Sequence, residues 1–193
     1  MGVGEKVKNV LPTNPKSVPY VDEGELLTGF TAGIYDAFDN VLPEGTIGHI
    51  LVKGPSVRQG YINNPVATEE SFTEEGWLRT GDLGFSRNRR LTITGRSKEM
   101  ISIGGMNFYP HDIERVAGKE KIIDGRPVVA CGVYDCEIFA EELILFDSYK
   151  KGTETFLPVI NAVKERIARD FNLPVSRVLP IKSIPRTTSG KLS

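Results

Sequence analysis

The sequence has few of the residues that build covalent or metal-based cross-links. Two of its 193 residues are cysteine and two are histidine. Cys131 and Cys136 are five positions apart, a spacing that matches neither a zinc-binding pair nor a redox CxxC motif, and two cysteines do not make a disulfide framework. We therefore expect both thiols to be buried in a reducing compartment. With His49 and His111 as the two histidines, we expect no histidine-based metal site.

The chain also lacks an excess of charge and a long apolar run. Twenty-four Lys and Arg residues against 25 Asp and Glu residues give a formal net charge of −1, which provides no polybasic surface for nucleic acid or anionic lipid. No apolar run approaches the roughly 20 residues of a membrane-spanning helix, and the start "MGVGEKVKNV" lacks the apolar core of a signal peptide. These absences predict a cytoplasmic protein with no nucleic-acid partner and no membrane span.

Differences in sequence pattern along the chain predict two structural units. Residues 1–23, rich in Pro, Lys and Asn, are predicted to form a lead-in segment. Residues 24–95 contain short apolar runs separated by turn residues, a pattern typical of an antiparallel sheet or small barrel. Residues 99–193 mix strand and helix patterns, and residues 96–98 mark the change. The predicted fold class is α+β, with a small β-rich, barrel-like subdomain followed by an α+β C-terminal domain.

Periodic patterns predict several individual elements. The alternating segment "RRLTITG" predicts a strand that ends at Gly95, and "RPVVACGVYD" and "EELILFDSYK" predict two more. Apolar residues three or four positions apart predict an amphipathic helix over 156–171. Two shorter helices are predicted, one opened by Pro65 and one with Pro110 near its start.

The closing segment "IPRTTSGKLS" ends in a lysine-bearing loop that differs from a standard phosphate-binding loop. The pattern GxxxxGK[ST] requires a glycine five positions before Gly190, where Pro185 stands, and Leu192 follows Lys191 instead of Ser or Thr. Its small and hydroxylated residues would still let the backbone approach a ligand, and the Lys191 ammonium can meet anionic oxygens. On these residues alone, a solvated tail is the favoured alternative.

Three further positions are candidates for ligand binding. Asp82, in "GWLRTGDLGF", is predicted in a turn, where its carboxylate can accept hydrogen bonds from both ribose hydroxyls or cap its own turn. Arg96 carries a fixed-charge fork suited to ribose or phosphate. Gly104 and Gly105 form a tight break between strands that can admit a ligand, with a plain hairpin turn as the alternative.

Three segments in order carry a resemblance to a known family. "LRTGDLG", "TGRSKEMISIGGMNFYPHDIE" and "IPRTTSGK" resemble consecutive signature motifs of the adenylate-forming superfamily, which includes acyl-CoA synthetases, fatty acyl-AMP ligases, peptide-synthetase adenylation domains and luciferases. "LPEGTIGHILVKGPSVRQGY" resembles the segment that precedes them. The similarity runs from about Gly24 to the end. "MNFYPHDIE" is more similar to acyl-CoA synthetases and fatty acyl-AMP ligases than to peptide-synthetase domains.

The resemblance implies an ATP-dependent acid–thiol ligase. Family members join a carboxylic acid to ATP, with Mg²⁺, and most pass the resulting acyl group to CoA or to the phosphopantetheine thiol of an acyl carrier protein. By this resemblance six residues have roles: Lys191 is the catalytic lysine, Asp82 and Arg96 contact the ribose of ATP or AMP, Lys98 is the hinge of a mobile C-terminal domain, and Gly104 and Gly105 line the pantetheine channel.

Departures from the family pattern limit what the chain is expected to do alone. The family's phosphate-binding loop is absent, as is the Tyr-Gly-x-Thr-Glu segment whose Glu serves Mg²⁺, so no metal ligand is predicted here. His49 stands where the family usually has Glu. We therefore expect the C-terminal part of an enzyme, cut at both ends and inactive in adenylation without the remainder of that enzyme. The alternative is a non-catalytic module that docks a carrier protein with a degenerate adenylate-forming fold.

Overall fold

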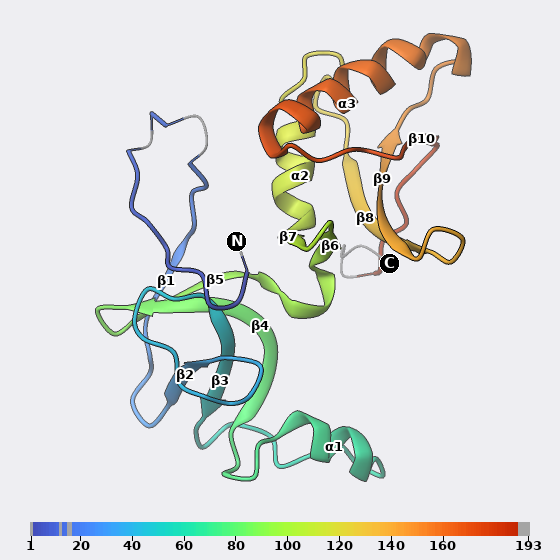
Figure 1. Ribbon diagram of the computed structural model, residues 1–193. Helices are drawn as coiled ribbons and strands as arrows, with labels where there is room; N and C mark the ends of the chain where they lie inside the picture. Colours follow the sequence, from blue (N-terminus) through green and yellow to red (C-terminus); the bar gives the residue numbers. More distant parts are fainter. Residues whose placement is uncertain (1, 12, 15–16, 189–193) are drawn as a thin grey trace. The chain divides into compact units, whose positions relative to one another are not determined.

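The computed structural model describes residues 2–11, 13–14 and 17–188, and it divides the chain into two compact units (Figure 1). The first unit is Met1–Glu99 and the second is Met100–Ser193. Within the described part of the chain, no helix combines the length and the apolar character needed to cross a membrane.

The first unit is built on a five-stranded antiparallel sheet with the order β1-β5-β4-β3-β2. Its strands are β1 (Asp22–Glu25), β2 (Thr31–Tyr35), β3 (Gly48–Lys53), β4 (Leu78–Arg87) and β5 (Arg90–Arg96). The predicted helix opened by Pro65 is confirmed as α1 (Pro65–Ser71), where the Asn64 side chain caps the first turn by accepting a hydrogen bond from the Ala67 backbone N–H. A 3₁₀ turn, η1 (Ser97–Glu99), follows β5.

Part of the predicted lead-in segment is incorporated in the first unit. The Gly4 backbone N–H donates to the Ile47 carbonyl at 2.8 Å, and the Val7 N–H donates to the Gly45 carbonyl at 2.8 Å. The Arg87 guanidinium also donates to the Val7 carbonyl at 3.2 Å. These long-range bonds satisfy backbone groups on both segments, so the chain is already part of the fold well before residue 24.

The second unit packs two helices against a three-stranded sheet of order β10-β9-β8, in which β8 and β9 are antiparallel and β9 and β10 are parallel (Figure 1). Its elements are β6 (Ile101–Ile103), β7 (Met106–Phe108), α2 (Pro110–Ala117), β8 (Val128–Asp135), β9 (Ala140–Ser148), η2 (Thr153–Thr155), α3 (Leu157–Phe171) and β10 (Arg177–Ile181). The predicted helix over 156–171 is therefore confirmed as α3. Its buried residues Val163 and Ile167 join one hydrophobic core with Leu143 and Leu145 of β9.

The prediction of two buried cysteines is wrong. Cys136 is exposed in the connection between β8 and β9, and Cys131 is half-buried, both as free thiols. Alternate residues of a strand face opposite sides, and in β8 Val128 and Ala130 face the core, so Cys131 lies on the other side of the sheet. Burial, with a smaller contribution from the Glu114 carboxylate, raises the pKa of the Cys131 thiol.

Candidate functional site

The structure brings two of the predicted site residues together. Asp82 in β4 and Arg96 in β5 are direct cross-strand partners, and the Arg96 Nε donates to the Asp82 Oδ1 at 3.1 Å. The side chains keep 25% and 51% of their surface exposed, so a ligand can still reach both groups. A carboxylate beside a guanidinium offers acceptors and donors within one short stretch of surface.

Asp82 lies within strand β4, so the predicted turn is wrong. The glycine that suggested a turn, Gly81, has a φ of 79° and forms part of an irregularity inside the strand. On the β3 side the register passes from Leu51 opposite Arg79 to His49 opposite Leu83. Three residues of β4 therefore stand opposite one residue of β3, an enlarged form of the β-bulge that re-aims side chains in natural sheets.

Lys98 is exposed in η1, directly after β5 and two residues before the second unit begins at Met100. Lys98 therefore lies two residues after Arg96, the last residue of β5. Its role as a hinge stays a prediction.

Gly104 and Gly105 form the two-residue turn of the β6–β7 hairpin, which confirms the hairpin alternative. Their φ values are 59° and 77°, and Ile103 pairs with Met106 across the turn. A type I′ turn needs positive φ at both central positions, which glycine adopts without steric cost. A Cβ added to either glycine would meet nothing within 4 Å, so it is the backbone conformation, and not a lack of space, that favours glycine here. The predicted contact with pantetheine stays a prediction.

Lys191, the predicted catalytic lysine, lies outside the described residues, as do its neighbours 189–193. Among the described residues, no group of three or more His, Cys, Asp or Glu side chains is arranged to hold a metal ion.

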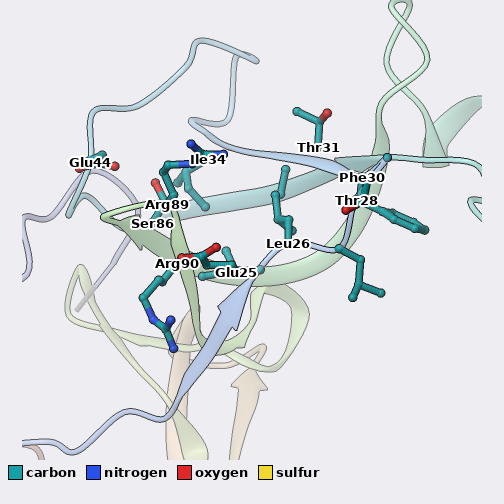
Figure 2. A pocket seen from close by; sticks show the side chains of 14 residues that line it. Glu25, Leu26, Thr28, Phe30, Thr31, Ile34, Glu44, Ser86, Arg89 and Arg90 are labelled. Atoms are coloured by element: carbon teal, nitrogen blue, oxygen red, sulfur yellow. The ribbon is translucent and has the colours of Figure 1, made fainter.

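A cavity of about 670 Å³ lies elsewhere in the first unit (Figure 2). It is lined by the connection between β1 and β2, by β2, and by the turn between β4 and β5, and its lining includes the charged residues Glu25, Glu44, Arg89 and Arg90. The lining residues do not include the Asp82–Arg96 pair. The candidate site is thus the exposed strand pair and not this hollow.

A second Asp–Arg pair joins the β2–β3 connection to β4 and provides a comparison. Arg79 donates through both terminal nitrogens to the two carboxylate oxygens of Asp39, at 2.6 Å each. The Arg79 guanidinium, through this hydrogen bonding and its charge, holds the pKa of the Asp39 carboxyl below its ordinary value. Here both carboxylate oxygens are used, whereas Arg96 bonds Asp82 through one nitrogen and one oxygen. The Asp82 pair therefore keeps more hydrogen-bonding capacity for a ligand.

Comparisons with known proteins decide the family. No family model matched the sequence. The nonribosomal peptide synthetase apvA of Aspergillus terreus is 42% identical over 198 residues, covering 92% of this chain and 20% of the relative. The oxalate–CoA ligase of Saccharomyces cerevisiae is 36% identical over 167 residues, covering 85% of this chain and 30% of the relative. The solved structure of McyG A-PCP complexed with phenylalanyl-adenylate matches with a TM-score of 0.77 and 32% identity, covering 90% of this chain and 32% of that one.

The chain belongs to the adenylate-forming superfamily. The similarity of the fold to these neighbours confirms the predicted α+β fold class. The chain spans less than a third of the length of the two curated relatives named above. Both a peptide synthetase and a CoA ligase are among the matching adenylate-forming proteins, so the predicted similarity to acyl-CoA synthetases and fatty acyl-AMP ligases over peptide-synthetase domains stays a prediction.

Proposed function

We propose that the chain acts as the C-terminal part of an ATP-dependent ligase that activates a carboxylic acid as an acyl-adenylate and transfers it to the thiol of CoA or of a carrier protein. The observation that carries this proposal is the pairing of Asp82 with Arg96, within hydrogen-bonding distance on adjacent strands and open to solvent. Supporting it, the relatives include a CoA ligase, and a neighbouring structure is of an A-PCP protein with an adenylate.

In this proposal Asp82 and Arg96 bind the ribose of ATP and of the acyl-adenylate. The Asp82 carboxylate accepts hydrogen bonds from the two vicinal hydroxyls, a charge-assisted contact that is stronger than one between neutral groups. Arg96 keeps that carboxylate oriented while its remaining N–H groups donate to ligand oxygens. Holding the ribose in one place positions the α-phosphate for attack by the substrate carboxylate, so these contacts act by orientation.

The other predicted residues take roles that follow from charge and mobility. Lys191 would neutralise charge that develops on the α-phosphate during adenylation. Lys98 would be the point about which the second unit moves between adenylation and thiol transfer. Gly104 and Gly105 would let a pantetheine arm pass close to the backbone because they carry no side chain. Mg²⁺ would neutralise the pyrophosphate leaving group, held by residues other than those described here.

The test is acid-dependent exchange of pyrophosphate into ATP, measured on the full-length protein that carries this chain with a panel of carboxylic acids. Asp82→Ala removes a charge-assisted contact, and we expect kcat/KM for ATP to fall roughly 10- to 100-fold. Asp39→Ala is the matched control, because it removes the carboxylate of another Asp–Arg pair in the first unit, which also involves a residue of β4. We expect that variant to stay within about twofold of wild type. Equal losses in the two variants would contradict the role given to Asp82.

The 193-residue chain provides a second test. We expect it to show no exchange by itself, because the phosphate-binding loop and the Glu-bearing segment of the family are absent from it. Exchange by this chain at a rate comparable to the full-length protein would contradict the proposal that the rest of an enzyme is required.

A further inference from the structure

The irregularity in β4 that precedes Asp82 depends on one side-chain hydroxyl. The Thr80 Oγ1 donates to the Ile50 carbonyl of β3 at 2.9 Å and accepts from the Asp82 backbone N–H at 3.0 Å. Ile50 is 2% exposed and has no directly opposed residue in the register between β3 and β4. The Thr80 hydroxyl therefore provides a hydrogen-bond donor to the Ile50 carbonyl at the point where the β3–β4 register is interrupted. It also links β3 to Asp82.

Gly81 makes this arrangement possible. Its φ of 79° lies in the left-handed region, and a Cβ at this position would meet nothing within 4 Å. Residues with a side chain occupy this region at a cost of roughly 1–2 kcal/mol, although Asn tolerates it better than Ala. The constraint at Gly81 is thus conformational and not one of space, which separates it from glycines that are needed for close packing.

We infer that Thr80 and Gly81 are positioning residues that hold Asp82 opposite Arg96 and thereby set the enzyme's selectivity for nucleotides with both ribose hydroxyls. This inference rests on the proposed function and deepens it. Asp82 is tied on one side by its backbone N–H to Thr80 and on the other by its side chain to Arg96. Loss of the hydrogen bond from the Asp82 N–H to the Thr80 hydroxyl lets the Asp82 carboxylate turn away from the position in which it can accept from both vicinal ribose hydroxyls.

The substitution Thr80→Val keeps the shape of the side chain and removes both hydrogen bonds, whereas Thr80→Ser keeps the hydroxyl. The readout is the ratio of kcat/KM for ATP to that for 2′-deoxy-ATP in pyrophosphate exchange by the full-length protein. We expect wild type and Thr80→Ser to favour ATP with ratios within about twofold of each other, and Thr80→Val to lose roughly fivefold or more of that preference.

A purely structural role predicts a different result. If Thr80 served stability alone, Thr80→Val would lower kcat/KM for both nucleotides in proportion and leave the ratio at the wild-type value, which would overturn the inference. If wild type exchanged pyrophosphate without preferring ATP, the ribose role of Asp82 would fall together with this inference. Absence of any exchange by wild type would instead overturn the proposed function itself.

A second pair of variants keeps the inference testable if Thr80→Val fails to fold. Gly81→Ala disfavours the positive φ without introducing a clash, and Gly81→Asn restores tolerance of it. We expect Gly81→Ala to lose part of the preference for ATP and Gly81→Asn to retain more of it. The reverse order, or equal ratios in folded samples of both variants, would overturn the role given to the bulge.

Discussion

The two units of this protein are stabilised in different ways. Among the described residues, six buried hydrophobic side chains lie in the first unit and nineteen in the second, although the units are of similar length. The second unit gathers most of its buried side chains into one core cluster between α2, α3 and the β8–β9–β10 sheet. The first unit has less apolar burial to stabilise it, so more of its order must come from backbone pairing between strands.

This difference explains where the candidate site can be disturbed. In the first unit the Asp82–Arg96 pair depends on strand register and on a bulge, and one substitution can alter either of them. In the second unit the glycine pair sits on an exposed hairpin, and the core lies under other elements. We therefore expect first-unit substitutions to affect geometry sharply, and second-unit core substitutions to affect stability in proportion to the volume removed.

The largest expected effect is that of Gly84→Ala in β4. A Cβ at Gly84 would clash with the backbone oxygen of Thr92 in β5, so the strands would have to separate. We expect the first unit to lose about 3 kcal/mol or more of its free energy of unfolding, measured by urea denaturation. Amide signals of the second unit should stay at their wild-type positions in a two-dimensional NMR spectrum.

Gly76→Ala is the control for that experiment. Gly76 also has a positive φ, 77°, but a Cβ there meets nothing within 4 Å, so we expect a loss of about 1 kcal/mol from backbone strain alone. Equal destabilisation by the two substitutions would mean that close strand packing does not hold the first unit together. It would contradict the claim that the first unit depends on strand pairing more than the second unit does.

A smaller effect is expected for Val163→Ala in α3. Val163 is 1% exposed, and removing two methyl groups from the core should lower the free energy of unfolding of the second unit by about 2 kcal/mol. Val66→Ala makes the same change in helix α1, where the side chain is 64% exposed, and should shift stability by less than about 0.5 kcal/mol. A loss at Val163 no larger than that at Val66 would contradict the central role of this core.

Local patterns in the sequence were sufficient to predict the elements that depend on neighbours along the chain. The stripe of apolar residues at helical spacing predicted α3, and the alternation in "RRLTITG" predicted β5. Pro65 marked a helix start, because proline restricts the backbone angles at its own position. The consecutive glycines Gly104 and Gly105 marked a hairpin turn, because glycine extends the range of backbone angles available.

Long-range pairing could not be predicted in the same way. Asp82 and Arg96 are fourteen positions apart, and they meet because β4 and β5 pair in a register that is itself irregular beside Leu83. A glycine before an aspartate is typical of a turn, which is why the sequence alone predicted one at Asp82. The bonds between residues near Gly4 and Ile47 likewise follow no periodic pattern, because they depend on where distant segments meet.

The smallest expected effect is a pH dependence that belongs to the first unit. Burial of the half-buried His49 in β3, and then the nearby Arg79 charge, lower the pKa of this imidazole, with a weaker opposing effect from Asp39. In the unfolded chain the His49 imidazole therefore takes up a proton near pH 6.5, whereas in the folded chain it takes up a proton only at a lower pH. The contribution to stability is fully present above about pH 6.5 and is lost as the pH falls through the lower, folded-state value.

We expect the free energy of unfolding of the first unit to decrease between pH 7 and pH 5, with a slope against pH that corresponds to the uptake of less than one proton on unfolding. We expect His49→Gln to remove that slope. The pKa of Asp39 is lowered by Arg79, so its contribution is lost below about pH 3.8, outside this window. His111→Gln, in the second unit, should leave the first-unit slope unchanged. A slope that survives His49→Gln, or that follows the second unit, would show that the first unit does not owe its pH response to the imidazole half-buried in its sheet.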